Sequence, residues 1–508
     1  MDATNATPIP VEPAVPIGGT PIVAPETFVV PAADNPAVPL PQGQSAGATP
    51  GAADNPLIPG GVVSAPPQQA SSGNSILRRL LMVIVLLVFL TGLILLGKFV
   101  FGLIAGAKEV TIVYWGLWEN DAMIRPVLAD FEASHPKIKV QYVKQSHRQY
   151  RERLVAAIDR GEGPDVFRFH NTWIPMLRSS LMPVPKDIMT VSEFTQSFYP
   201  VAVSDLVGGQ SIYGIPLMID GLGLYYNEDL FAAAGVKPPV TWEDVLNVVP
   251  KLTVRNEKLI STSAIALGTT GNVENFSDIL ATMMLQNGTK LSDPTGKTAE
   301  ETLLFYRKFA DPADPVYTWN ETLDNSIYAF AMGKVAMIFA PSWRAFDIKQ
   351  MNPNIRFKIT VVPQLPGNTV SWASYWVEGV SVKSKYSSAS WEFLKYLTGK
   401  QGAAKLYTEE SKGRLFGEPY ARVDMGKNLI DDPYVGAYMK QAPNAKSFPL
   451  ASRTFDNGLN DKLIKYLEDA VNGLSQGASP KSVLDTASAG FRQVFGSYGL
   501  SSSSAPAR

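Results

Sequence analysis

The chain has 508 residues, a formal net charge of −1 at pH 7 and no cysteine. This length exceeds one ordinary hydrophobic core and predicts two or three folded units. The lack of cysteine excludes disulfides, thiolate metal sites and a cysteine nucleophile, and the balanced charge gives no indication of nucleic-acid binding.

The N-terminal region, residues 1–75, contains no lysine or arginine and is rich in proline, alanine and glycine. Such a composition cannot bury enough apolar surface to offset chain entropy. We therefore predict a disordered, partly polyproline-like tail, and a second disordered tail at residues 501–508.

Residues 76–107 are predicted to form one transmembrane anchor helix. Leu80–Leu96 carries no charge, and roughly 20 apolar residues are enough to cross a bilayer. Arg78 and Arg79 precede the run, so the positive-inside bias predicts a cytoplasmic N-terminus and an extracytoplasmic remainder, in a single-pass protein of the cell membrane.

A cleavable secretory signal is the alternative for this segment, and Ala105-Gly106-Ala107 would suit its cleavage site. The apolar part is longer than the roughly 7 to 15 residues of a signal core, which favours an uncleaved anchor.

Strands and helices alternate after residue 109. We expect a strand through Trp115, a helix in which Ile124, Val127, Leu128 and Phe131 share one face, a strand from Ile138, a helix at about 147–160 and a strand at 165–169. Pro126 fits this first helix only if it lies in the first turn. The alternation favours parallel pairing, with ligands bound beyond the carboxyl ends of the strands.

The residues at those strand ends are the first binding candidates. Trp118 and Glu119 follow the first strand, and Asn171 and Trp173 follow the third. Capping or surface roles would explain the polar ones equally well.

The stretch SIYGIPLMIDGLGLYYNEDLFAAAG, residues 211–235, predicts the next strand at Ile215–Ile219 and a helix capped by Asn227 and ended by Gly235. Between them stands one carboxylate, Asp220. A buried unpaired charge costs several kcal/mol, so Asp220 is expected to bond either a ligand or the backbone or an arginine at a hinge.

Further along, a helix capped by Thr241 opens a mostly helical region. Strands are then predicted at KVAMIFAPSW, IRFKITVVPQLPG and SWASYWVEGVSV, followed by the helices ASWEFLKYLTGKQGAAKLYTEES and NDKLIKYLEDAVNGLSQG. Trp242, Trp391, Tyr225 and Tyr226 are interpreted as core residues.

From Val110 to about Leu500 the chain resembles the extracellular solute-binding proteins of ABC importers, in the group that includes maltose-binding protein and other sugar binders. The motifs that carry the resemblance follow in order: FEASHPKIKV, GEGPDV, YGIPLMIDGLGLYYNEDLFAAAGV with TWEDV, FAMGKVAMIFAPSW, ITVVPQLPG and SSASWEFLKYLTG. The tail and the single-span anchor depart from the family, whose members more often have a cleaved signal or a lipidated cysteine.

The resemblance implies an α/β, two-lobe periplasmic-binding-protein-like (type II) fold in which hinge closure traps a solute. Chain crossings are expected near 219–224, 374–380 and 423–430. The solute-binding domain, 109–500, would then divide into an N-lobe of about 109–219 and 375–427 and a C-lobe of about 222–372 and 430–500.

Sugars present apolar C–H faces and a rim of hydroxyls, so their binding sites combine flat aromatic rings with a few polar groups. Trp343 resembles a stacking tryptophan of sugar-binding relatives, and the position of Asp220 resembles one that carries a carboxylate for sugar hydroxyls. The predicted ligand-binding residues are Trp118, Glu119, Asn171, Trp173, Asp220, Trp343, Tyr375, Trp376 and Arg414.

The resulting hypothesis is a membrane-anchored receptor that delivers a sugar or oligosaccharide to ABC permease subunits, with no cofactor. A membrane-tethered sensor or scaffold without transport is the alternative. A carbohydrate-active enzyme is the second alternative, since two carboxylates in a cleft can form a glycosidase site. The three histidines have no metal-binding spacing, and no metal site is predicted.

Overall fold

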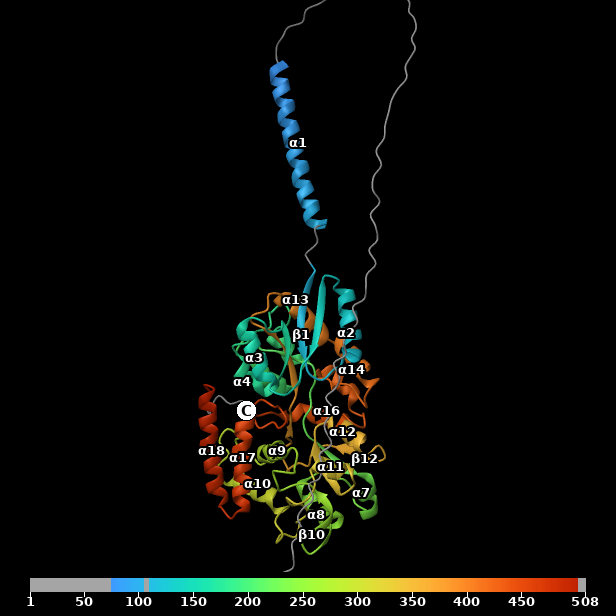
Figure 1. The fold of residues 1–508 in the computed structure, drawn as a ribbon, viewed down its shortest axis with the longest axis vertical. Helices are drawn as coiled ribbons and strands as arrows, with labels where there is room; N and C mark the ends of the chain where they lie inside the picture. Colours follow the sequence, from blue (N-terminus) through green and yellow to red (C-terminus); the bar gives the residue numbers. More distant parts are fainter. Residues whose placement is uncertain (1–74, 105–108, 501–508) are drawn as a thin grey trace, which may run out of the picture. The chain divides into compact units, whose positions relative to one another are not determined.

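The structure is a computed structural model that describes residues 75–104 and 109–500 (Figure 1). The tails predicted at 1–75 and 501–508 therefore lie outside the described residues, apart from Ser75, which begins a helix.

Helix α1 spans Ser75–Ile104, and its described side chains run from Arg79 to Leu95. Over the described residues, none of the helices combines the length and the apolar character needed to cross a membrane. The transmembrane anchor predicted at 76–107 is thus not supported by the structure.

The first sheet is assembled from strands far apart in the sequence. Its order is β2-β1-β3-β14-β4, with β7 paired to β14. The strands are β1 (Val110–Gly116), β2 (Ile138–Lys144), β3 (Val166–His170), β4 (Leu181–Met182), β7 (Ile215–Pro216) and β14 (Trp376–Ser381). β1 is parallel to β2 and β3, whereas β14 is antiparallel to β3, β4 and β7.

The second sheet has the order β12-β8-β11-β10-β9. Its strands are β8 (Gly223–Asn227), β9 (Val254–Asn256), β10 (Leu259–Ile265), β11 (Val335–Ala340) and β12 (Phe357–Thr360). β10 is parallel to β11, and β8 is antiparallel to β11 and β12. Two short ribbons complete the strands: β5 (Val207–Gly208) with β6 (Ser211–Ile212), and β13 (Ser371–Trp372) with β15 (Ala445–Lys446).

Helices pack around both sheets (Figure 1). Those before β8 are α2 (Asp121–Ser134), α3 (Tyr150–Arg160), η1 (Asn171–Trp173), α4 (Ile174–Leu177), α5 (Val191–Ser197) and α6 (Pro200–Leu206). Those from β8 to β13 are α7 (Glu228–Ala234), α8 (Trp242–Leu252), α9 (Phe276–Gln286), α10 (Lys297–Lys308), α11 (Ser326–Ala331) and α12 (Arg344–Met351). Those after β14 are α13 (Ser387–Leu397), α14 (Lys400–Ser411), α15 (Val423–Gly426), η2 (Lys427–Leu429), α16 (Gly436–Gln441), η3 (Ala442–Asn444), α17 (Leu459–Ser475) and α18 (Pro480–Ser497).

The predicted parallel pairing holds for β1, β2 and β3 but is wrong for the stretch that follows. Ile215–Ile219 was expected to be the next parallel strand, yet only Ile215 and Pro216 form a strand, and it is antiparallel to β14. The regular strand of this stretch is β8, which starts at Gly223 and belongs to the second sheet. Gly221 and Gly223, which follow Asp220, therefore lie where the chain passes from one sheet to the other.

Local capping follows the sequence closely in α7. The Asn227 side chain accepts hydrogen bonds from the N–H groups of Asp229 and Leu230, and Gly235 ends the helix with φ of 64°, as predicted.

Pro126 differs from expectation, since it lies in the interior of α2 rather than in its first turn. Its ring deprives the carbonyl of Ala122 of a helical partner. Ala122 is exposed, so water can satisfy that carbonyl.

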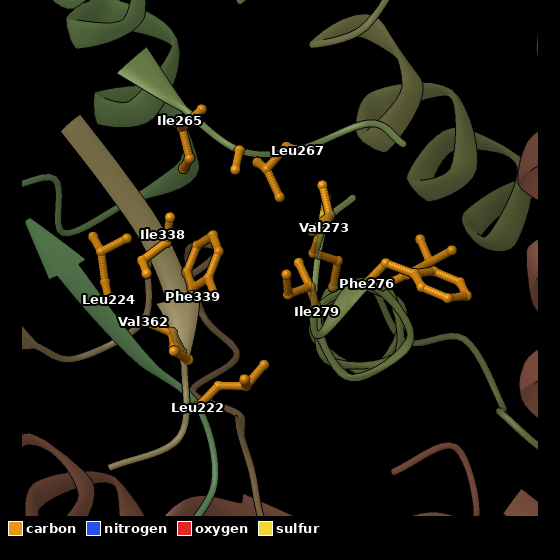
Figure 2. Close-up of a cluster of buried hydrophobic side chains, with 14 of the residues drawn as sticks. Leu222, Leu224, Ile265, Leu267, Val273, Phe276, Ile279, Ile338, Phe339 and Val362 are labelled. Atoms are coloured by element: carbon orange, nitrogen blue, oxygen red, sulfur yellow. The ribbon is translucent and has the colours of Figure 1, made fainter. Parts of the chain in front are cut away.

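Each sheet has its own buried apolar core, and these define two lobes. The first lobe buries residues of β1, α2, α3, β3, β14 and α13, and the second buries residues of β8, α8, α9, β11, α17 and α18. Figure 2 shows part of the second core, with labelled side chains of β8, β10, β11 and α9, among them Leu224, Ile265, Ile338 and Ile279.

The connection between the lobes is tight at Gly221. Gly221 pairs with Ala373, and the backbone N–H of Ser374 donates to the carbonyl of Asp220 at 2.9 Å. A Cβ at Gly221 would lie 1.8 Å from the carbonyl oxygen of Trp372, so only glycine fits here. Two chain crossings thus lie side by side at the base of the space between the lobes.

Candidate functional site

A cavity of about 440 Å³ lies between the two lobes. A volume of this size is typical of a site for a small organic ligand. The first lobe contributes Trp118, His147, His170, Met218, Ser374, Trp376 and Arg414 to its wall. The second lobe contributes residues of four segments: Asp220–Leu222, Asn275 with Asp278, Pro341–Phe346, and Ser452–Phe455.

Two tryptophans form an aromatic wall on the first lobe. Trp118 follows β1, and Trp376 opens β14 opposite His170 of β3. Their ring centroids lie 5.4 Å apart at an interplanar angle of 72°. Trp376 also meets the ring of His170 edge-on at 5.2 Å, which fixes its orientation. Both predicted residues line the cavity.

Trp343 lines the same cavity from the second lobe, in the turn between β11 and α12. Its side chain is 36% exposed, which is unusual for a tryptophan outside a binding surface. The guanidinium of Arg344 lies 4.2 Å from the ring centroid and covers one part of the ring. The structure therefore places this predicted residue in the cavity wall with apolar ring surface still accessible.

Asp220 is buried at the base of the cavity and is held by the turn that follows β11. Its carboxylate accepts hydrogen bonds from the N–H of Gly221 at 2.8 Å, and from the N–H and hydroxyl of Ser342 at 3.1 and 2.8 Å. Burial raises the pKa of Asp220 to about 7, against the lowering effect of those hydrogen bonds. The partners are backbone and hydroxyl groups, so its charge is not neutralised by a cation.

A second carboxylate, Asp278, was missed by sequence analysis. It lies on α9, accepts from the indole N–H of Trp372 at 2.7 Å and from the N–H of Ser452 at 3.1 Å, and lines the cavity. Burial raises its pKa to about 6. The signal in the sequence was an acid within FSDILATMMLQ, an otherwise buried apolar helix.

Arg414 lines the cavity as predicted and is held by two acids. It pairs with Glu410 at 2.7 Å and Glu418 at 3.1 Å. Burial raises the pKa of Glu410 to about 8, and the charge of Glu418 adds to the rise. The positive charge of the Arg414 guanidinium is therefore partly neutralised by these carboxyl groups.

Glu119 is not among the residues that line the cavity. It is fully buried and accepts from Arg168 at 2.6 Å, while Arg168 also donates to Glu378 at 2.6 Å. Burial acts to raise the pKa of Glu119, but the Arg168 guanidinium holds it below its ordinary value. Glu119 therefore belongs to a buried ion-pair network with Arg168 and Glu378, behind the wall of the cavity.

Asn171, Trp173 and Tyr375 also lie behind the cavity rather than in its wall. The side-chain amide of Asn171 and the hydroxyl of Tyr375 both donate to Asp205, at 2.8 and 2.7 Å. Trp173 packs edge-on against Trp376 at 5.4 Å. These three residues support the first-lobe wall from behind.

Several residues of the wall had no signal in the sequence. They come from separate segments that only the tertiary structure brings together, and include His147, Arg344, Phe346, Phe416, Glu418, Ser452, Arg453 and Phe455. His170, which ends β3 at a position where the sequence predicts that ligands collect, also lines the cavity. Burial lowers its pKa to about 3, so it is a neutral imidazole bonded to Thr172 and Ser374.

Within residues 109–500, oxygens of Glu119, Glu410 and Glu418 approach within 4.8 Å of one another, as metal ligands do. Arg414 pairs with two of these acids and Arg168 with the third. Guanidinium groups thus already supply the positive charge that a metal would bring.

The comparisons with known proteins agree with this architecture. The sequence model for bacterial extracellular solute-binding proteins matches residues 127–415. The multiple sugar-binding protein of Streptococcus mutans is 24% identical over 316 residues, which is 59% of this chain and 73% of that protein.

Two solved structures show the same fold. The sugar-binding protein MalE of Xanthomonas citri superposes with a TM-score of 0.61 at 20% identity, covering 77% of this chain and 98% of that one. A cyclo/maltodextrin-binding protein complexed with maltotetraose gives a TM-score of 0.62 at 18% identity, with coverage of 77% and 98%. The two-lobe α/β fold is therefore that of these binding proteins.

Proposed function

Because this chain belongs to the family of bacterial extracellular solute-binding proteins, we propose that it binds a sugar or oligosaccharide between its two lobes and delivers it to an ABC permease. The observation that carries the proposal is the cavity itself, which is lined by Trp118 and Trp376 of one lobe and by Trp343 of the other. Relatives that include a multiple sugar-binding protein and a maltodextrin-binding protein support the choice of ligand.

The chemistry of the wall suits an uncharged, hydroxyl-rich ligand. Trp343, Trp376 and Trp118 offer flat apolar surfaces that pack against the C–H faces of pyranose rings. Asp220 and Asp278 keep carboxylate oxygens at the cavity, where they accept hydrogen bonds from sugar hydroxyls. Arg414 donates to hydroxyl or ring oxygens on the first-lobe side.

Each lobe holds part of this set, so binding is strongest when both lobes contact the ligand together. We propose lobe boundaries at about 109–219 with 375–427, and 222–372 with 430–500. A hinge near Gly221 and Ala373, where two crossings pair, would let the lobes close and exclude water from the ligand.

Calorimetry of the full chain tests the proposed ligand class. The carbohydrates tested are monosaccharides, maltose and maltotetraose. Amino acids, short peptides and divalent cations are tested as the competing ligand classes. We expect saturable binding of at least one carbohydrate. Binding of only the peptides, amino acids or cations would contradict the proposal.

Delivery to a permease needs a separate test. Affinity capture of the tagged chain from native membranes, with sugar present, should recover two permease subunits and an ATPase. Recovery of signalling proteins without a permease would favour a sensor instead.

A further inference from the structure

The segment Arg453–Asn457, which leads into α17, is the most unusual backbone beside the cavity. Three of the five non-glycine residues with positive φ in the described part of the chain lie in it: Arg453 at 62°, Phe455 at 54° and Asn457 at 44°. Left-handed conformations are uncommon for arginine and phenylalanine and persist only when neighbouring contacts enforce them. Such conformations are concentrated at ligand clamps and switches.

Hydrogen bonds to the Asp456 side chain stabilise this backbone conformation. Its side chain is fully buried, and its carboxylate accepts from the N–H of Gly458 at 3.0 Å, from the N–H of Asn460 at 2.9 Å and from the Asn460 side chain at 3.0 Å. With Asp456 turned inward, its neighbours Arg453 and Phe455 are left at the cavity wall.

The segment belongs to the second lobe but contacts the first. The Phe455 ring lies 4.6 Å from the ring of His147, which in turn lies 6.0 Å from Trp118. Arg151 of α3 donates from Nε to the carbonyl of Asp456 at 2.6 Å. The three aromatic rings therefore form a row that runs from one lobe to the other along the cavity.

We propose that residues 453–457 form a gate between the lobes, in which Phe455 closes against His147 over a bound sugar and so determines how long the sugar is retained. This inference rests on the proposed function for the identity of the ligand. The gate itself rests on the contacts of Phe455 with His147 and of Asp456 with Arg151.

We expect Phe455 to cover an apolar face of the sugar. A phenyl ring has no hydrogen-bonding group, so it gains from C–H contacts and from excluding water around the polar groups deeper in the cavity. Closure of the gate should therefore slow ligand dissociation far more than it changes association.

Stopped-flow tryptophan fluorescence of the full chain, with the carbohydrate that binds most tightly in the calorimetry, measures both rates. Phe455→Ala should raise koff about tenfold and change kon by less than about threefold. Phe455→Tyr, which keeps the ring, should restore koff. Tyr328→Ala is the control, because Tyr328 is an exposed aromatic on α11 and is not among the residues that line the cavity. Equal koff for Phe455→Ala and Tyr328→Ala would overturn the proposal.

Hydrogen exchange measured without a sugar tests the gate even if the chain binds no carbohydrate. Hydrogen exchange should be faster in Phe455→Ala at residues 453–458 and also at residues 145–150 of the opposite lobe, and unchanged in Tyr328→Ala. Unaltered exchange at 145–150 would overturn the gate. Failure of the wild-type chain to bind any carbohydrate would instead overturn the proposed function, with the exchange result deciding the gate.

Discussion

Asp220 and Ser342 are joined by two kinds of hydrogen bond, one from the backbone N–H at 3.1 Å and one from the hydroxyl at 2.8 Å. The pair connects the first chain crossing to the turn that carries Trp343. An acid that could bind a sugar hydroxyl and a ring that could stack on the same sugar are thus held in fixed relation.

Replacing Trp343 with alanine should weaken sugar binding by about 1 to 3 kcal/mol, because an aromatic stacking surface is lost. Calorimetry measures the difference, and Trp343→Phe should recover part of it. Tyr386→Ala, at another exposed aromatic outside the cavity wall, serves as the control. If Trp343→Ala binds as tightly as the wild type, this tryptophan is not a ligand contact.

The unfolding stability of the wild type relative to Asp220→Asn should fall as pH rises. The folded pKa of Asp220, about 7, is above the ordinary value of 3.8 that applies to the unfolded chain. The native state therefore holds a proton that the unfolded state releases, and this stabilising contribution, complete below about pH 4, is lost as pH rises through 7.

Thermal unfolding of both proteins from pH 4.5 to 8 checks this dependence. Asp278 also titrates with a raised pKa, but it is present in both proteins and cancels in the difference. A wild-type minus Asp220→Asn difference that is constant with pH would show that Asp220 keeps an ordinary pKa.

Arg168→Met should destabilise the protein by roughly 3 to 5 kcal/mol, because it leaves the buried carboxylates of Glu119 and Glu378 without their cation. Urea unfolding measures the loss. Arg160→Met is the matched control. Arg160 pairs with Glu162 in full contact with solvent, where an ion pair contributes about 1 kcal/mol or less. Similar effects of the two substitutions would contradict a structural role for the Arg168 network.

Tyr375→Phe should lower the unfolding free energy by about 1.5 to 3 kcal/mol, because the hydrogen bond from the hydroxyl to the Asp205 carboxylate is removed. Sugar affinity should change less than about threefold, since Tyr375 lies behind the cavity wall. A large loss of sugar affinity with unchanged stability would show that Tyr375 contacts the ligand, as the sequence predicts.

The sequence predicts best those features that depend on nearby residues. The apolar face of α2 and the caps of α7 follow from spacing and side-chain chemistry within one turn. Trp118 could be predicted at the cavity because it follows a strand, where ligands collect in such folds. Trp343 and Trp376 were predicted there from the resemblance to sugar-binding proteins.

Features that depend on distant partners could not be predicted. Glu119 resembled a ligand residue because nothing near it in the sequence reveals Arg168, which balances it. Asn171 and Tyr375 were suggested for the same reason, since Asp205 lies far from both along the chain. His147 and Phe455 gave no signal because their contact exists only once the two lobes have assembled.

The place of β14 between β3 and β4 has a consequence for biosynthesis. A chain emerging from the ribosome completes β3 and β4 long before residues 376–381 become available. Until then β3 presents an unpaired edge, and the first lobe lacks its central strand. Most of the second lobe is therefore synthesised before the sheet of the first lobe can be completed, so the two lobes cannot fold strictly one after the other along the chain.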